Sequence, residues 1–129
     1  MKKPVRLYSR RCGDVSNIGK YYMRPLDGDL VVFIYYVNKN IGAVAYASSC
    51  QYDNVTGRPI AGQVALNLHH MNDFRFSNFE NNFMTVLHEI HHILGFSPFF
   101  FNKFVAPGTT NRIPPSNVIK DFYGTPYIK

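Results

Sequence analysis

The sequence contains no tryptophan, only two cysteines, and only 8 acidic residues against 14 lysines and arginines. Its longest apolar run, Leu30 to Val37, is far shorter than the roughly 20 residues that a membrane-spanning helix needs. No apolar segment follows the basic N-terminal residues, so the sequence shows no signal peptide. Because 46% of its 129 residues are hydrophobic and 16% are aromatic, we expect one folded domain with its own core rather than a disordered tail.

The formal net charge of +6 raises the question of a nucleic-acid partner. Five of the basic residues lie within the first 11 positions, namely Lys2, Lys3, Arg6, Arg10 and Arg11. No aromatic-interleaved or groove-reading motif accompanies them. We therefore expect a solvated terminus and no nucleic-acid partner.

Two features bear on the compartment in which the protein folds. Cys12 and Cys50 allow only one intramolecular disulfide, and their spacing does not decide whether it forms. Asn54-Val55-Thr56 is an N-glycosylation sequon, which matters only in a secreted protein. Such sequons are common by chance, so this one gives weak support for an oxidising compartment.

Three segments have the composition of β-strands, after an irregular stretch over residues 1–28 that has no clear periodicity. Residues 29–37 are β-branched and aromatic, with apolar side chains on both faces, which predicts a central strand buried on both sides. Residues 42–48 follow a short turn and are predicted to form a hairpin with that strand or to lie near it. Residues 60–68 are the third strand candidate.

The clearest helix signal covers residues 78–94. Ser77 and Glu80 have capping-box spacing, which places the helix start with Ser77 as the N-cap. Apolar residues then recur mostly in steps of three or four, at Phe79, Phe83, Met84, Leu87, Ile90, Ile93 and Leu94. Gly95 stands where a glycine commonly ends a helix in the left-handed conformation. The tail, 96–129, is rich in Pro and Gly, and its aromatic patch from Phe96 to Phe101 is expected to serve core or interdomain packing.

The predicted helix carries an H-E-x-x-H motif, formed by His88, Glu89 and His92. Residues four apart lie on one helical face, so both histidines can direct a ring nitrogen at one metal ion. Glu89 is rotated by about 100° from His88, which removes it from the ligand set but leaves it able to take a proton from a water molecule. These residues predict a zinc site with an adjacent general base.

The remaining histidines fit the motif less well. His91 could pair with His88 at a spacing of three, but the motif fixes His88 and His92 as the ligands, so His91 is interpreted as a flanking residue. His69 and His70 follow the third strand and are interpreted as a loop or rim pair. The acid beyond the helix, Asp121, is a candidate substitute ligand in an unpatterned part of the tail.

With Gly95 the motif extends to H-E-x-x-H-x-x-G, the first part of the metzincin signature, although Pro98 stands where the third histidine normally follows. The stretch from His88 to Ser97, continued by Pro98-Phe99-Phe100, resembles the leishmanolysin family of surface metalloproteases, in which an insertion separates the glycine from the third histidine. Four upstream segments extend the resemblance over residues 10 to about 105: Cys12-Gly13-Asp14, the 29–37 strand, which is similar to the family's central strand, and the segments 45–50 and 57–62.

The resemblance implies an α+β fold of the zincin or metzincin type. A small mixed sheet would pack against an active-site helix at about 78–94. His88 and His92 would be Zn²⁺ ligands and Glu89 the catalytic base, Cys12 would pair with Cys50, and the strand at 42–47 would be the cleft rim that binds substrate by strand addition.

The implied function is a zinc-dependent metalloendopeptidase that acts on protein or peptide substrates outside cells or at the cell surface, where the family is associated with host interaction and adhesion. No histidine follows His92, so the third ligand is expected in a segment that this chain lacks. We therefore expect residues 1–129 to be a partial catalytic domain, divided into 1–28, 29–68, a zinc-binding helix at 77–95, and 96–129. The alternative is an inactive fragment, or an adhesion or binding remnant, of such a protease.

Overall fold

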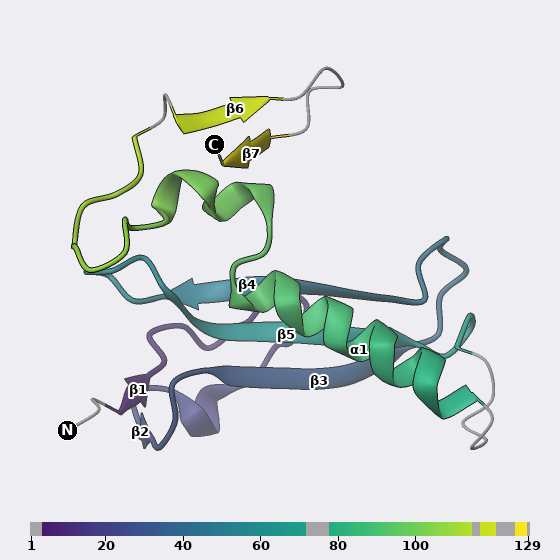
Figure 1. Ribbon diagram of the computed structural model, residues 1–129. Helices are drawn as coiled ribbons and strands as arrows, with labels where there is room; N and C mark the ends of the chain where they lie inside the picture. Colours follow the sequence, from purple (N-terminus) through teal and green to yellow (C-terminus); the bar gives the residue numbers. More distant parts are fainter. Residues whose placement is uncertain (1–3, 72–77, 115–116, 121–125, 129) are drawn as a thin grey trace.

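A three-stranded sheet and one long helix organise the chain, which the computed structural model describes over residues 4–71, 78–114, 117–120 and 126–128. The α+β prediction is confirmed (Figure 1). The sheet consists of β3 (Val31–Val37), β4 (Ala45–Tyr52) and β5 (Pro59–Asn67), and the helix is α1 (Phe79–Leu94).

Shorter elements precede and follow this unit. The first segment, predicted to be irregular, contains β1 (Val5–Arg6), the 3₁₀ turn η1 (Gly19–Tyr21) and β2 (Pro25–Leu26), with β1 antiparallel to β2. The tail contains the 3₁₀ helix η3 (Pro98–Lys103) and an antiparallel pair, β6 (Val118–Lys120) and β7 (Pro126–Ile128). Within the described residues, no helix has the length and apolar character that crossing a membrane requires.

The middle of the sheet is β5, which runs parallel to β3 and antiparallel to β4. Most of its residues are buried, and several are small, including Ala61, Gly62 and Ala65. Small side chains let both neighbouring layers approach the strand closely, so β5 is the strand that is covered on both faces.

Two predictions about the strands are wrong. The segment 29–37 was predicted to be a central strand, but β3 is an outer strand of the described sheet, and its Ile34 and Tyr36 are 59% and 73% exposed. Of the two arrangements expected for residues 42–48, the hairpin with β3 is wrong: the hairpin joins β4 to β5, and β4 lies in the same sheet as β3 with β5 between them. Apolar composition identifies a strand but does not decide its place in the sheet.

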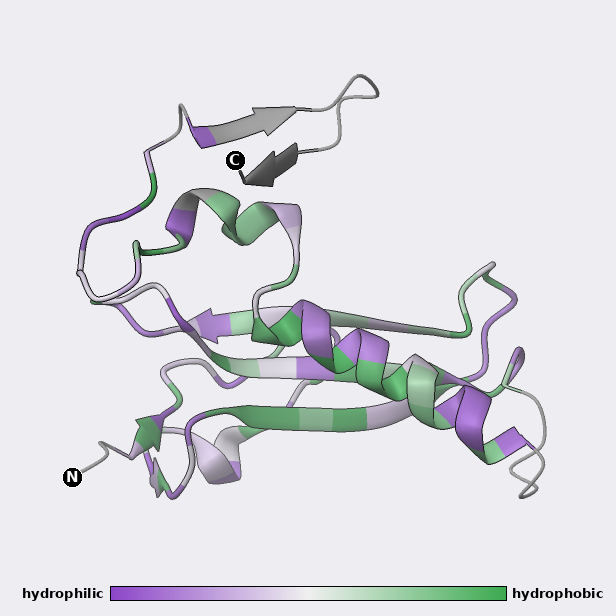
Figure 2. Cartoon of the chain, viewed as in Figure 1, coloured by the Kyte–Doolittle hydropathy of each residue, from purple (hydrophilic) through white to green (hydrophobic). Residues whose placement is uncertain are grey.

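Helix α1 lies across one face of the sheet and packs against β4 and β5 (Figure 1). Its hydrophilic and hydrophobic residues alternate in bands along the helix, as Figure 2 shows. The contact is close at Gly62, where a side chain would meet Ile93 of the helix, and Ile93 is fully buried. The hydroxyl of Ser49 on β4 donates a hydrogen bond to the carbonyl of Ile93 at 3.3 Å, which fixes the last turn of α1 over β4.

The N-terminal residues cover the opposite face of the sheet. Val5, Leu7, Cys12 and Ile18 form a buried cluster with Ala61 of β5. Most of the anchoring bonds come from two glutamines of the sheet rather than from a regular strand ladder. The sheet is therefore covered on one face by helix α1 and on the other by the irregular N-terminal segment.

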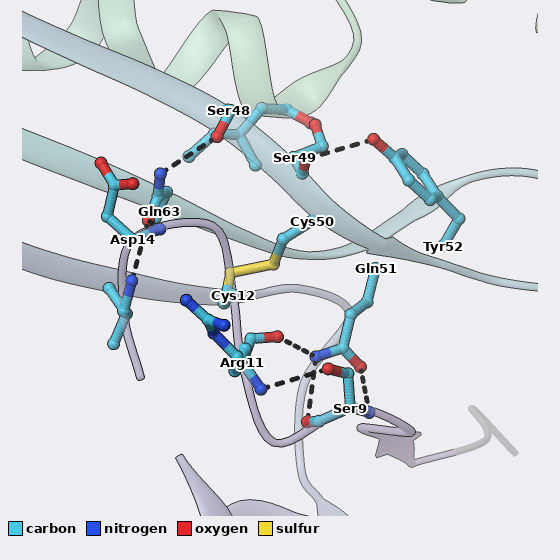
Figure 3. The surroundings of a disulfide bond; sticks show 12 residues. Ser9, Arg11, Cys12, Asp14, Ser48, Ser49, Cys50, Gln51, Tyr52 and Gln63 are labelled. Carbon is cyan, nitrogen blue, oxygen red and sulfur yellow. Dashed lines mark hydrogen bonds between the residues drawn. A yellow bond between two sulfur atoms is a disulfide. The ribbon is translucent and has the colours of Figure 1, made fainter. Parts of the chain in front are cut away.

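Gln51 and Gln63 hold this N-terminal layer in place (Figure 3). The side-chain oxygen of Gln51 accepts hydrogen bonds from the amides of Tyr8 at 2.9 Å and Ser9 at 3.3 Å. The side-chain oxygen of Gln63 accepts one from the amide of Asp14 at 2.8 Å. Both glutamines are buried, and their amide groups satisfy backbone groups that have no strand partner.

A disulfide between Cys12 and Cys50 joins the N-terminal layer to strand β4 of the sheet (Figure 3). Cys50 lies at a register shift of β4, between Ser49 and Gln51, where one extra residue interrupts the pairing with β5. Because the bulge breaks the usual alternation of side chains, Cys50 and Gln51 both reach the N-terminal layer, while Ser49 faces the helix.

Candidate metal centre

Helix α1 brings His88 and His92 together. It begins at Phe79 with Asn78 as its N-cap, one residue later than the predicted cap, and Ser77 lies outside the described residues. The predicted end at Leu94 is confirmed, with Gly95 in the left-handed conformation at φ 114°. The rings of the two histidines lie 4.7 Å apart between centroids, and their Nε2 atoms are 3.1 Å apart.

The backbone after the helix orients His92. Gly95 turns the chain so that the amide of Phe96 donates to the carbonyl of His91 at 3.1 Å. The same turn places the carbonyl oxygen of Phe96 2.9 Å from Nδ1 of His92. Since a carbonyl only accepts, Nδ1 carries the proton, and Nε2 of neutral His92 is left with its lone pair. A hydrogen bond of this kind is the usual support of a metal-binding histidine.

The two nitrogens fit a shared zinc ion. Two ligands of one tetrahedral zinc, each at about 2.0–2.1 Å, lie about 3.3 Å from one another, close to the 3.1 Å between these Nε2 atoms. Within the described residues, no third His, Cys, Asp or Glu joins them in a group of three. The described part of the chain therefore offers two candidate ligands, one fewer than the three protein ligands of a catalytic zinc site.

Glu89 follows His88 directly and is buried, with 9% of its surface exposed. It lies on the side of α1 that packs on the sheet, four residues before the fully buried Ile93. Its backbone position is therefore fixed by the same packing that fixes the two histidines, which is what a general base beside a metal site requires.

A cavity of about 450 Å³ opens beside His92. Its wall combines the outer strand β4 with the segment that follows the helix, and the lining residues are Ala47, Ser48, Ser49, Tyr52, His92, Ser97, Phe99 and Phe100. The ammonium group of Lys103 lies 3.6 Å from the ring centre of Phe99 and 5.0 Å from that of Tyr52, a cation–π arrangement that holds η3 against the end of β4.

The aromatic patch after the helix is only partly core. Phe100 is buried, as core packing requires, whereas Phe96 and Phe99 are exposed, so for these two the interdomain alternative stays a prediction. Both Phe99 and Phe100 lie near Tyr52 of β4, with ring centres 6.2 and 5.9 Å from that of the tyrosine, but only Phe100 is buried.

The strand expected at the cleft rim, 42–47, is observed as β4, Ala45–Tyr52. It is an outer strand of the described sheet, and four of its residues line the cavity beside His92.

The other candidate histidines do not join the site. Nδ1 of His91 lies 2.7 Å from the carbonyl of Leu87, and its ring packs against Phe96, as a flanking residue would. His69 and His70 pack edge to face with each other, with ring centres 4.8 Å apart. Asp121 lies outside the described residues.

The motif identified the two histidines and the glutamate, but not the group that orients His92. That group is the backbone carbonyl of Phe96, and a backbone acceptor leaves no mark in a side-chain motif. The signal that could have revealed it is Gly95, since a left-handed residue directly after a helix folds the next carbonyl back toward the last turn.

An α+β unit with an H-E-x-x-H helix seated across its sheet has the architecture of a metallopeptidase. The family model described as leishmanolysin matches residues 10–122, which is most of the chain. The chain therefore belongs to the leishmanolysin family, whose members are surface or extracellular metallopeptidases. No curated protein matches it.

Proposed function

We propose that this chain carries the zinc-binding and general-base part of a leishmanolysin-type endopeptidase site. The observation that supports this most strongly is the pair of Nε2 atoms 3.1 Å apart, one of them set in its metal-binding tautomer by the carbonyl of Phe96. A histidine pair with a purely structural role has no need of this arrangement.

His88 and His92 would hold the zinc ion. When bound, zinc supplies the Lewis acidity that polarises the carbonyl of the bond to be cleaved. The carboxylate of Glu89 takes a proton from the attacking water and later gives it to the departing amine. Peptide or protein substrates would lie along β4 beside the cavity, held in part by strand addition.

The third ligand would come from outside the described residues. Asp121 is one candidate, and a segment of a longer protein is the other. In either case the described residues would provide the two ligands that a helix holds at a fixed spacing, and the third ligand would complete the protein's share of the zinc coordination. The action would take place outside cells or at a cell surface, in keeping with the Cys12–Cys50 disulfide.

The test is zinc binding by the purified chain, measured as bound metal per chain and as affinity. The comparison is between wild type, His88→Ala with His92→Ala, and the matched double variant His69→Ala with His91→Ala. Each double variant loses two histidines, but His69 and His91 are exposed and lie outside the proposed ligand set.

The proposal expects one zinc per chain in wild type and in the matched control, and none in the His88 and His92 variant. Equal zinc binding by the two double variants would overturn it, and a wild-type chain that binds no zinc would make the chain an inactive fragment, the second candidate function. Hydrolysis is tested separately with Glu89→Gln against Glu80→Gln, an exposed glutamate in the first turn of the same helix. If zinc binds but wild type cleaves no peptide, the chain is a binding remnant or an inactive part of the protease, which is the second candidate function.

A further inference from the structure

The sequon lies at the turn that joins β4 to β5, away from the helix that carries the histidines (Figure 1). Asn54-Val55-Thr56 is the one N-x-S/T sequence in the chain. All three residues are exposed, and Val55 is 88% exposed. A bulky substituent at this turn would extend into solvent without displacing the core.

The turn closes without help from the side chain of Asn54. The oxygen Oδ1 of Asp53 accepts hydrogen bonds from the amide of Val55 at 3.1 Å, and from the amide and hydroxyl of Thr56 at 2.7 and 2.8 Å. Gly57, at φ 72°, completes the turn, and its amide donates to the carbonyl of Asp53 at 2.8 Å. Among the described residues, none of the bonds that close the turn uses the carboxamide of Asn54, so its nitrogen can carry a substituent while the turn stays intact.

A second, independent feature indicates the compartment in which this modification occurs. The disulfide between Cys12 and Cys50 ties the N-terminal layer to β4 four residues before Asn54. Disulfides form and persist in oxidising compartments, and N-glycosylation takes place in proteins that pass through the same secretory route. The exposed sequon and Cys50 of the disulfide lie on the same hairpin, and both features indicate the secretory route.

We propose that Asn54 is an N-glycosylation site. The donor is an oligosaccharide linked through diphosphate to a membrane lipid, and the transfer is carried out by a glycosyltransferase. The nitrogen Nδ2 of Asn54 forms a bond to C1 of the first sugar, the bond between C1 and the diphosphate oxygen breaks, and the lipid diphosphate leaves. The proton lost from Nδ2 passes to a base of the transferase, so no oxidant or reductant takes part.

The glycan would stand at the rim of a second cavity, of about 430 Å³, whose wall includes Asn54, Val55 and Thr56. It would cover the exposed side chain of Val55, an apolar group that otherwise faces solvent at the tip of a hairpin. A glycan placed here makes this end of the sheet more hydrophilic and leaves β4 free along the residues that line the cavity beside His92.

The test is translation of the full chain behind a cleavable secretion signal, with microsomes that hold the lipid-linked donor. Chains that have entered the microsomes are identified by their resistance to added protease. The proposal expects these chains to migrate as a larger species that peptide N-glycosidase returns to the unmodified size, with Asn54 converted to Asp at the site of release.

Four variants separate the sequon from an effect on folding or translocation. Asn54→Gln and Thr56→Ala should abolish the larger species, and Thr56→Ser should retain it. Asn40→Gln, an exposed asparagine in the loop before β4 and outside any sequon, should behave as wild type. Protease-protected wild-type chains that show no glycosidase-sensitive species would overturn the proposal, as would a larger species that persists in Asn54→Gln. Because the readout involves neither zinc nor hydrolysis, it is independent of the proposed peptidase function.

Discussion

Gly62→Ala tests how closely helix α1 is seated on the sheet. A Cβ added at Gly62 would meet Cγ2 of Ile93, and it would lie 3.0 Å from both Cδ1 and Cγ1. Because all three contacts fall on one fully buried side chain, Ile93 or the helix must shift to admit a methyl group at residue 62.

The expected loss follows from these contacts. Overpacking of a well-filled site by one methyl group costs about 1–3 kcal/mol. Lifting the helix would also lengthen the 3.3 Å bond from Ser49 to the carbonyl of Ile93, so we expect a loss toward the upper end of that range. Small domains have a total stability of about 5–15 kcal/mol, so the loss is readily measured.

The assay is denaturant unfolding of the oxidised chain with metal chelated, comparing midpoints and slopes of wild type, Gly62→Ala, Ile93→Ala and the double variant. Ile93→Ala alone leaves a cavity and should cost about 2–5 kcal/mol. In the double variant the new methyl at residue 62 fills part of that space, so its loss should be smaller than the sum of the two by about 0.5–3 kcal/mol. Additive losses, or a Gly62→Ala variant within about 0.5 kcal/mol of wild type, would refute this account of the packing.

Three further outcomes are expected. Replacing Cys12 and Cys50 together by Ser should lower the free energy of unfolding by about 2–5 kcal/mol, and wild type with reductant should match the variant. Gln51→Leu should leave two backbone amides of the N-terminal layer without an acceptor, at about 1–3 kcal/mol for each, and should speed their hydrogen exchange. Burial, followed by the hydrogen bond with Tyr46, raises the pKa of Tyr35 above its ordinary value of 10.0. The contribution of Tyr35 to the free energy of unfolding is therefore fully present below pH 10.0 and is lost as pH rises further. Above pH 10.0, the unfolding midpoint should fall less with rising pH for Tyr35→Phe than for wild type.

The helix was predictable because its signals are local. The recurrence of apolar residues and the left-handed Gly95 place its end at Leu94, and the spacing of His88 and His92 follows from helical geometry alone. The start differs by one residue: Asn78 stands at the N-cap position without a side-chain capping hydrogen bond, and short-range patterns place a helix end only to within one or two residues.

The order of the strands was not predictable in the same way. β3 has the more apolar sequence, yet β5 is central because its small residues accept the helix on one face and the N-terminal layer on the other. Pairing between strands is non-local, so it depends on which surfaces fit together rather than on the composition of either strand. The N-terminal layer illustrates the same limit, because buried glutamines on β4 and β5, far along the sequence from it, hold an aperiodic segment in one conformation.

The left-handed turn at Gly95 decides more than where the helix stops. It selects the ring nitrogen of His92 that is protonated, because the carbonyl of Phe96 reaches Nδ1 only when the chain reverses at that residue. A larger residue at position 95 would strain the backbone at φ 114° and withdraw this carbonyl, and His92 would then be divided between its two neutral tautomers. Under the proposed function, a substitution at Gly95, which is not itself a ligand, would thus be measured as weaker zinc affinity. The loss would follow the fraction of chains in which Nε2 of His92 carries a proton, because a protonated nitrogen cannot bind the metal.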